Sequence, residues 1–571
     1  MILTSLILVP LFFALLVGLM SDKHARPLAL IGNLITLAVT VLILVQFPWA
    51  GGGRAFEFES SASWLPSIGL NFTLGVDSLA VSLVALTALL GPICVVASTT
   101  AITERVKTYY SWLLVLQAAM FGVFIARDLV LFYICFEFTL IPMFILISLY
   151  GSTNRKAASV KFFLYTFTGS MIALAGLVYV AWKYAVTHNG EWTFDLAQLQ
   201  YAAGQLTATE QGWVLLALLA GFAVKVPIFP FHTWLPLAHT EAPTAGSVIL
   251  AGVLLKLGTY GIIRFAVPYC PLAFVEYAPI IATLCIIGIL YGGLICWVQT
   301  DVKKLVAYSS VAHLGFCVLG LAALNKVGLT GSILYMINHG LSTGALFLCI
   351  GMVYERYHTR SMKELGGLAA KMPVWSTFMV FFVMASVGLP GLNGFVSEFM
   401  CLLGTFQASS AWGSSGLWQT AGGLDGGQVP GATPGELGPW YAAIAGLGMI
   451  VAAMYLLYMT GKVVWGPLVL PHHHDSHGAH GAHGAHGAHE SHGPLPTDLN
   501  AREIWTLVPL AALCLILGVY PKPLIAALDG PVSQLTERVQ AARELVTTAN
   551  AAPTASEATP IPAALASEDQ K

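Results

Sequence analysis

The sequence predicts an all-α integral membrane protein with about fourteen transmembrane helices, and composition is the first observation behind that prediction. Hydrophobic residues make up 57% of the 571 residues and charged residues only 9%, whereas a typical soluble protein is about 25% charged. So few charges could not cover the water-exposed surface of a soluble protein of this length. The second observation is that the apolar residues gather into runs long enough to cross a bilayer.

A helix needs about 20 mostly apolar residues to cross the hydrocarbon core, and fourteen runs of the chain meet that requirement. The first begins at Met1 with no basic segment before it and no small-residue cleavage site after it. We therefore expect a retained span and not a removable signal peptide. In chain order the predicted spans are 2–20, 28–47, 77–99, 109–126, 129–149, 158–182, 212–231, 244–267, 276–298, 304–323, 329–353, 374–400, 439–461 and 504–520.

The lysines and arginines between the spans predict the orientation of the chain. Cytoplasmic loops of membrane proteins carry an excess of these two residues. The loops after odd-numbered spans hold fifteen of them, and the loops after even-numbered spans hold five. We therefore expect the odd-numbered loops to face the cytoplasm and both termini to face the opposite side.

Four ionisable residues lie deep inside apolar runs, away from loops and span ends. They are Glu137, Lys225, Lys256 and Glu398. A charge at the bilayer centre costs at least about 2.5–3.5 kcal/mol, so such a residue is a functional hypothesis by default. The alternative is that the two acids and two bases form ion pairs that only hold helices together.

Helix breaks beside two of these charges favour the functional interpretation. Prolines remove backbone donors and disrupt the preceding helical turn, and broken helices at membrane depth are tolerated where they line a cavity. Paired breaks in two halves of a chain indicate inverted repeats. We expect spans 4–8 and 9–13 to be two inverted five-helix repeats with broken helices 7 and 12. The breaking residues are Pro227 and Pro230 after Lys225, and Gly388, Pro390, Gly391 and Gly394 before Glu398.

Two histidines inside spans extend the set of polar residues. A lone histidine in a helix is more often a hydrogen-bonded core residue than a functional one. His313 and His339, however, lie among further polar residues, and histidine titrates near physiological pH. Together with the four charges they predict a path for protons across the membrane. The polar neighbours are Ser309, Ser310, Asn338, Ser342 and Thr343.

No cofactor is expected in this chain. The nine cysteines lie mostly within apolar runs, without metal-type spacing, and are expected to be small buried side chains. The apolar spans contain no glycine-rich phosphate loop and no histidine pair at ligand spacing. The net charge of −2 argues against binding to nucleic acid, which favours a basic face.

Four segments resemble the antiporter-like subunits of respiratory complex I. They are FYICFEFTLIPMF, KVPIFPFHTWLPLAHTEAPTAGSVILAGVLLKLGTYG, QTDVKKLVAYSSVAHLG and MINHGLSTGALFLCIGMVYERYHTR. The resemblance runs from about span 3 to REIWTLVPL at span 14. Among the three kinds of such subunit the chain is most similar to the M-type, or chain 4, which has a glutamate in broken span 12 where its relatives have lysine. Here that residue is Glu398. The long lateral helix of the L-type subunit is also lacking.

The resemblance implies a proton-translocating membrane subunit of NADH:quinone oxidoreductase and assigns a role to each residue. It implies that Glu137 pairs with Lys225, that Lys256 is the central relay, that His313 and His339 continue the path, and that Glu398 gates the periplasmic exit. It also implies the L-type and N-type chains as partners in the lipid bilayer, with NADH, FMN, iron–sulfur clusters and quinone held by partner subunits.

A movable pair of Glu137 and Lys225 would act as a switch. At about 7 Å in an effective dielectric of about 20, a carboxylate stabilises a charged amine by about 2.4 kcal/mol. Approach and withdrawal of the carboxylate would then load and unload the proton on the lysine. A fixed pair would be merely structural, and the sequence does not distinguish the two.

Two other functions remain open at this point: a subunit of a multi-chain Na⁺/H⁺ antiporter, which shares the fold and the lysines, and a scaffold that does not conduct. YERYHTR and the span-14 sequence favour complex I, and four buried charges argue against a scaffold. H⁺ is the expected ion, but the sequence does not distinguish it from Na⁺ and does not predict the number moved per cycle or the coupling mechanism.

These features divide the chain into five parts. We expect the N-terminal spans 1–3 in residues 1–100, the first repeat in 101–270 and the second in 271–465. A histidine-rich cytoplasmic loop occupies 466–503, and the last span and tail occupy 504–571. The mitochondrial relatives lack such a loop, so a bacterial plasma membrane is expected.

The histidine-rich loop reads HHHDSHGAHGAHGAHGAHESH over residues 472–492 and holds nine of the sixteen histidines. Histidine-rich tracts bind nickel, copper or zinc, although such repeats also expand by chance in solvated loops, which is the interpretation we favour. Adventitious metal binding would involve His472, His473, His474, His477 and His480.

We expect the native protein, without an added tag, to be retained on a nickel column through this loop. A variant lacking residues 472–492 should flow through under the same conditions and serves as the control. Flow-through of the unaltered protein would show that the loop is covered in the native state.

Overall fold

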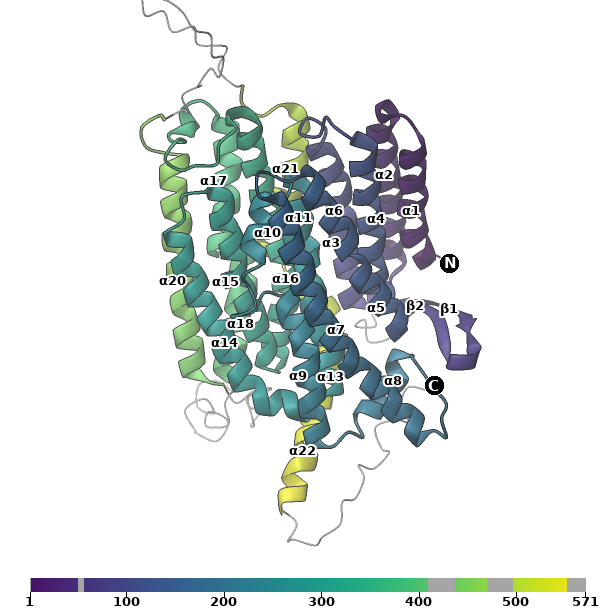
Figure 1. The fold of residues 1–571 in the computed structure, drawn as a ribbon. Helices are drawn as coiled ribbons and strands as arrows, with labels where there is room; N and C mark the ends of the chain where they lie inside the picture. Colours follow the sequence, from purple (N-terminus) through teal and green to yellow (C-terminus); the bar gives the residue numbers. More distant parts are fainter. Residues whose placement is uncertain (1, 50–55, 409–436, 470–496, 552–571) are drawn as a thin grey trace, which may run out of the picture.

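The computed structural model describes residues 2–49, 56–408, 437–469 and 497–551, which form a bundle of helices (Figure 1). In these described ranges, twelve helical segments are long and apolar enough to cross a membrane. They correspond to twelve of the fourteen predicted spans. The other two, spans 7 and 12, are each interrupted, and these are the spans in which the sequence predicts breaks. The prediction of an all-α membrane protein is confirmed.

The N-terminal part of the bundle contains α1 (Ile2–Leu19), α2 (Asp22–Gln46), α3 (Ser78–Ala97) and α4 (Val106–Ile125). Between α2 and α3 the chain forms an antiparallel hairpin of β1 (Glu57–Leu65) and β2 (Leu70–Val76), joined by the turn Pro66–Ile68. The sequence analysis did not predict this hairpin. It lies at the lower end of the bundle in Figure 1, whereas α1 and α2 are connected at the upper end.

Span 5 is divided at Thr139 into α5 (Leu129–Phe138) and α6 (Leu140–Tyr150). Then come α7 (Arg155–Thr187), the short α8 (Leu196–Ala203), α9 (Ala208–Lys225) and α10 (Leu235–Glu241). The break in span 7 lies between α9 and α10 and contains Pro227 and Pro230. Lys225 is therefore the last residue of a half-helix and not a residue of a continuous span.

Span 8 is continuous but irregular. It consists of α11 (Thr244–Ile249), α12 (Leu255–Gly261) and α13 (Val267–Tyr269). These are joined by two π-helical turns, Leu250–Leu254 and Ile262–Ala266. Such π-helical turns are rare and occur mostly at functional sites, and here they flank the segment that carries Lys256.

The second half of the bundle contains α14 (Pro271–Trp297), α15 (Val302–Ala322), α16 (Lys326–Tyr357), the turn Leu368–Ala370, α17 (Pro373–Val387), α18 (Asn393–Gln407) and α20 (Pro439–Val463). The break in span 12 separates α17 from α18. It begins at Gly388, with φ +83°, and includes Gly391, with φ +93°. These left-handed conformations favour glycine.

The chain continues with α21 (Ala501–Val519) and α22 (Lys522–Ala551). The sequence analysis predicted only a tail after the last span, and much of that tail is the helix α22. The division of the described chain into two repeats of five spans stays a prediction. The matching positions of the two breaks, in spans 7 and 12, are consistent with it.

Burial decides which spans can carry polar residues. The apolar windows of span 8 and α16 are 100% buried inside the protein and that of α15 is 94% buried, against 28% for α1 and α21. Polar side chains on span 8, α15 and α16 therefore face other helices and not lipid. These three elements hold Lys256, His313 and His339.

One buried ion pair fastens the lower end of span 8 to the start of α3. Asp77 is 2% exposed, accepts a hydrogen bond from the Ala80 backbone N–H at 2.9 Å, and is paired with Arg264. Removing one partner of a buried pair leaves an uncompensated charge and costs about 3–5 kcal/mol.

We expect Arg264→Leu to lower the free energy of unfolding of the solubilised protein by about that amount, measured as a fall in Tm. Arg264→Leu combined with Asp77→Asn should recover most of the loss, because asparagine keeps the capping oxygen and removes the charge. A double variant as unstable as the single one would contradict this account.

Candidate functional site

The centre of the site is Lys256, which is completely buried on the short α12 segment between the two π-helical turns. Its Nζ lies 2.7 Å from His339 Nδ1 on α16 and also donates to the backbone oxygen of Ala251. An ammonium group can donate three hydrogen bonds, so Lys256 has donors enough for both contacts. Lys256 and His339 thus form a direct amine–imidazole contact between span 8 and α16.

A second group of contacts joins α15, α16 and α18. The Tyr335 hydroxyl donates to Glu398 Oε1 at 2.6 Å and lies 2.8 Å from His313 Nδ1. His313 Nδ1 is itself 3.3 Å from the same carboxylate oxygen. On its other side, His313 Nε2 lies 3.4 Å from the Tyr455 hydroxyl of α20. Imidazole, phenol and carboxylate can all give or take a proton at these distances.

The two groups of contacts are neighbours. The ring centroids of His313 and His339 are 6.1 Å apart. We use "polar lane" for the set Lys256, His339, His313, Tyr335 and Glu398. Each member of the polar lane is at most 4% exposed, so it runs inside the protein from span 8 to broken span 12.

The glycine at the break in span 12 keeps space for the carboxylate. A Cβ atom at Gly388 would lie only 2.5 Å from Glu398 Oε2, and Gly388 also has the left-handed φ of +83°. Glu398 Oε2 has no hydrogen-bond partner among the described residues. The Glu398 Oε2 atom thus lies beside a glycine, where a side chain would leave it no space.

Lys225 and Glu137 lie at the other broken element, and the structure does not join them in an ion pair. Lys225 Nζ donates to the backbone oxygen of Phe136 at 3.1 Å and to Thr139 Oγ1 at 3.4 Å, and it lies 3.5 Å from the centroid of the Phe136 ring. Both carboxylate oxygens of Glu137 are buried without a hydrogen-bond partner in the described part of the chain. Lys225 thus binds two residues that flank Glu137 in the sequence, Phe136 and Thr139, and does not bind the Glu137 carboxylate.

Most of the polar neighbours predicted for the path have local structural roles. Ser309, Ser310 and Ser342 donate to backbone oxygens of their own helices. Asn338 Nδ2 donates to the Asn393 backbone oxygen at 2.8 Å and so fastens α16 to α18. These residues position the polar lane and do not form part of it.

Two residues of the site were missed by the sequence analysis. Tyr335 gave no signal, because a tyrosine in an apolar span is usually a core residue. His239 lies in the second of the four quoted segments and was not singled out. It is completely buried on α10, its ring stacks on Phe347 with centroids 4.7 Å apart, and neither ring nitrogen has a partner among the described residues.

No group of three or more histidine, cysteine, aspartate or glutamate residues in the described ranges could hold a metal ion. The loop histidines His472, His473, His474, His477 and His480 lie outside these ranges. The nine cysteines are free, and eight of them are buried, as predicted. The amine, imidazole, phenol and carboxylate groups of the polar lane can hold and transfer protons.

Comparison with known families gives one match, for residues 126–420, to the family described as NADH:quinone oxidoreductase/Mrp antiporter, transmembrane. The matched segment contains every residue of the polar lane and also Glu137, Lys225 and His239.

Comparison with curated proteins finds relatives that cover almost all of the chain. NADH-quinone oxidoreductase subunit M of Rhodobacter capsulatus is 39% identical over 531 residues, which are 92% of this chain and 93% of the relative. NADH-ubiquinone oxidoreductase chain 4 of Arabidopsis thaliana is 37% identical and covers 94% of this chain and 97% of its own.

Among solved structures, a chain of respiratory complex I from Thermus thermophilus with bound NADH is similar with a TM-score of 0.77 and 27% identity. The similarity covers 94% of this chain and 100% of that one. A chain of the Mrp complex from Dietzia has a TM-score of 0.73 at 22% identity, over 95% of this chain and 98% of its own. The second similarity concerns the fold alone.

Proposed function

We propose that this chain carries protons across the membrane. It belongs to the NADH:quinone oxidoreductase/Mrp antiporter family of membrane subunits, and its relatives are named subunit M or chain 4 of NADH-quinone oxidoreductase. The observation that supports the proposal is the polar lane. It is a buried row of proton-exchanging groups with 2.7 Å between Lys256 and His339 and 2.6 Å between Tyr335 and Glu398.

Protons suit this row better than metal cations do. Amines and imidazolium groups are hydrogen-bond donors when charged, and hard cations such as Na⁺ require several oxygen ligands. In the described chain the polar lane offers one carboxylate and one phenol oxygen. Proton transfer along it needs only rotation of side chains and intervening water.

Each residue has a distinct role in the proposal. Lys225 receives and releases a proton at the division of span 5, and Glu137 controls it by approaching or withdrawing. Lys256 is the central relay and exchanges its proton with His339. His313 and Tyr335 then pass the proton to Glu398, which releases it towards the periplasmic side. His239, buried on α10 with both nitrogens free of partners among the described residues, is a further relay between Lys225 and Lys256.

The driving reaction takes place outside this chain. Electron carriers such as FMN and iron–sulfur clusters, with NADH and quinone, are assigned to partner subunits. The L-type and N-type antiporter-like chains are the proposed neighbours in the membrane. The proposed membrane is the plasma membrane of a bacterium. The excess of lysine and arginine in odd-numbered loops supports a cytoplasmic position for these loops, with both termini in the periplasm.

Lys225→Arg is the sharpest test of proton transfer at the first broken span. Arginine keeps the buried positive charge but does not deprotonate in proteins. We expect NADH-driven acidification of inverted vesicles and quinone reduction to fall together by at least about tenfold, since loss of a transferring group raises the barrier by more than about 1.4 kcal/mol. Lys225→Ala should have the same effect.

Lys304→Ala, which removes an exposed lysine, is the matched control and should leave both activities unchanged. Full activity of Lys225→Arg in an assembled complex would mean that only the charge matters and would favour a scaffold. Quinone reduction that persists while the complex exchanges Na⁺ for H⁺ would favour the antiporter.

Tyr335→Phe tests the contact between His313 and Glu398. The substitution removes one hydroxyl and leaves the ring in place. A hydrogen bond to a charged group is worth about 1.5–3 kcal/mol, so we expect proton pumping to fall about tenfold or more while the complex still assembles. Tyr269→Phe removes another buried hydroxyl, remote from the polar lane, and should leave pumping unchanged. Equal effects of the two variants would exclude Tyr335 from the path.

A further inference from the structure

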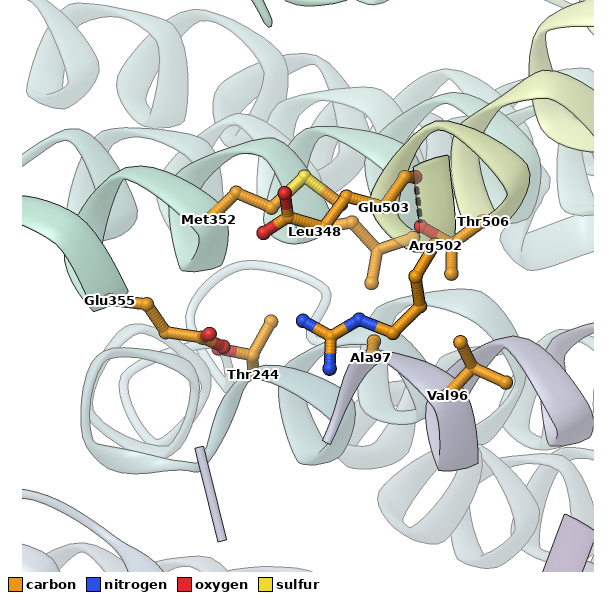
Figure 2. Close-up of a pocket in the computed structure, with 9 residues that line it drawn as sticks. All are labelled: Val96, Ala97, Thr244, Leu348, Met352, Glu355, Arg502, Glu503 and Thr506. Carbon is orange, nitrogen blue, oxygen red and sulfur yellow. Dashed lines mark hydrogen bonds between the residues drawn. The ribbon is translucent and has the colours of Figure 1, made fainter. Parts of the chain in front are cut away.

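Two small cavities lie among the described helices, and they differ in whether their polar groups have partners. The first lies at the upper end of the bundle, where the Arg502 guanidinium points towards Glu355 (Figure 2). The Thr100 hydroxyl joins these two charges, because it donates to Glu355 Oε2 at 2.6 Å and accepts from Arg502 at 3.2 Å. The two charges of the first cavity are therefore already bridged within the chain.

The second cavity lies inside the bundle, between α2, α3, α4 and span 8. It has room for about one water molecule. Two polar side chains line it, Asn33 near the middle of α2 and Gln117 near the middle of α4. They are only 1% and 3% exposed, so neither can obtain its hydrogen bonds from the water outside the protein.

One polar atom of each of these side chains has no hydrogen-bond partner among the described residues. These atoms are Asn33 Oδ1, an acceptor, and Gln117 Nε2, a donor. The orientation of the Asn33 amide follows from its Nδ2, which donates to the Ala29 backbone oxygen at 2.9 Å, so Oδ1 points away from that bond. A buried polar group without a partner destabilises the folded protein, and two of them lining one cavity require an explanation.

A glycine on α3 allows the two atoms to lie close together. A Cβ atom at Gly91 would be 2.2 Å from Asn33 Oδ1 and 2.3 Å from Gln117 Nε2. The two atoms are therefore at most about 4.5 Å apart, the sum of these lengths, yet they form no direct hydrogen bond. A water that makes two hydrogen bonds of about 2.8 Å at a tetrahedral angle joins atoms about 4.5 Å apart. The separation is thus within the reach of one bridging water.

We infer that the cavity between α2, α3, α4 and span 8 is a binding site for one buried water. The water accepts from Gln117 Nε2 and donates to Asn33 Oδ1. Its second hydrogen goes to the hydroxyl of Thr87, which also lines the cavity and itself donates to the Leu83 backbone oxygen at 2.8 Å. Three hydrogen bonds are the usual number for a buried water.

A metal cation does not suit the cavity. Hard cations need several oxygen ligands, and here the amide N–H of Gln117 would point at the ion. No acid or base is among the described residues that line the cavity, so the water is not a step of the proposed proton path. Its role is structural.

The water fastens the N-terminal spans to the first predicted repeat. α2 belongs to the N-terminal part, and its apolar window is only 33% buried, so much of its surface lies on the outside of the bundle. Between helices in a bilayer the hydrophobic effect supplies little attraction, and hydrogen bonds between helices contribute to their association. Asn33, the water and Gln117 form such a link between α2 and α4.

The first test is a cryo-EM map of the whole complex at a resolution that shows ordered waters. We expect one peak within hydrogen-bond distance of both Asn33 Oδ1 and Gln117 Nε2. The double variant Asn33→Leu with Gln117→Met keeps the shapes of the two side chains and should lose the peak. Thr40→Val, the control, removes a buried hydroxyl that donates within α2 to the Thr36 oxygen and should keep it.

The second test is thermal unfolding of the solubilised chain. Asn33→Leu alone should lower Tm by a few degrees, because it leaves the water and Gln117 without their acceptor. The double variant should recover most of this loss, since replacing both polar partners by apolar groups of the same shape is nearly neutral. Thr40→Val should lower Tm less than Asn33→Leu does.

Three results would overturn the inference. A direct hydrogen bond between Asn33 and Gln117, without a peak between them, would exclude the water. A peak at metal–oxygen distances from its neighbours would identify a cation. Loss of NADH-driven proton pumping in an assembled double variant would make the water part of a proton path and not a structural link. If the variants fail to assemble, the map of the unaltered complex decides alone.

Discussion

The structure depends on one constraint, which is that a charge inside a membrane protein must be stabilised by groups other than water. A continuous transmembrane helix offers none, because its backbone groups bond to one another. The chain meets the constraint by breaking helices where the charges lie. Lys225 is the last residue of half-helix α9 and Glu398 lies near the start of half-helix α18. The negative end of the α9 helix dipole therefore favours the positive charge of Lys225.

The same constraint explains why the polar residues concentrate on three elements. Span 8, α15 and α16 are almost completely surrounded by other helices, so a lysine or histidine on them does not meet lipid. Span 8 adds two π-helical turns, whose wider backbone leaves the Ala251 oxygen available to the Lys256 ammonium. The outer helices, by contrast, carry exposed apolar residues and are suited to contact with lipid or with other subunits.

The sequence predicted site residues and helix breaks correctly where a residue type is costly in a transmembrane helix. Lys225, Lys256, Glu137 and Glu398 stand out because charges are costly in apolar runs, and the breaks in spans 7 and 12 follow from proline and glycine. Tyr335 did not stand out, because only its contacts, and not its residue type, distinguish it from core tyrosines. The division at Thr139 lies just before Pro142, which cannot donate to the Phe138 backbone oxygen, and the first π-helical turn contains Gly252. The sequence analysis used neither signal. The expected Glu137–Lys225 ion pair depended on side-chain positions that no sequence pattern fixes.

The absence of that ion pair bears on how a proton is moved. Lys225 is bound to the Phe136 oxygen and to Thr139, on the same division of span 5 that carries Glu137. In the proposed mechanism, movement of the Glu137 carboxylate towards Lys225 would replace these neutral partners. At about 7 Å and an effective dielectric of about 20, the exchange is worth about 2.4 kcal/mol, enough to change the occupancy of a proton by more than tenfold. If Lys225 and Glu137 already formed an ion pair in the resting state, approach of the carboxylate could not change the proton occupancy of the lysine. A lysine held by neutral groups beside an unpartnered carboxylate is therefore the arrangement that a switch requires, and the division of span 5 is the element that can operate it.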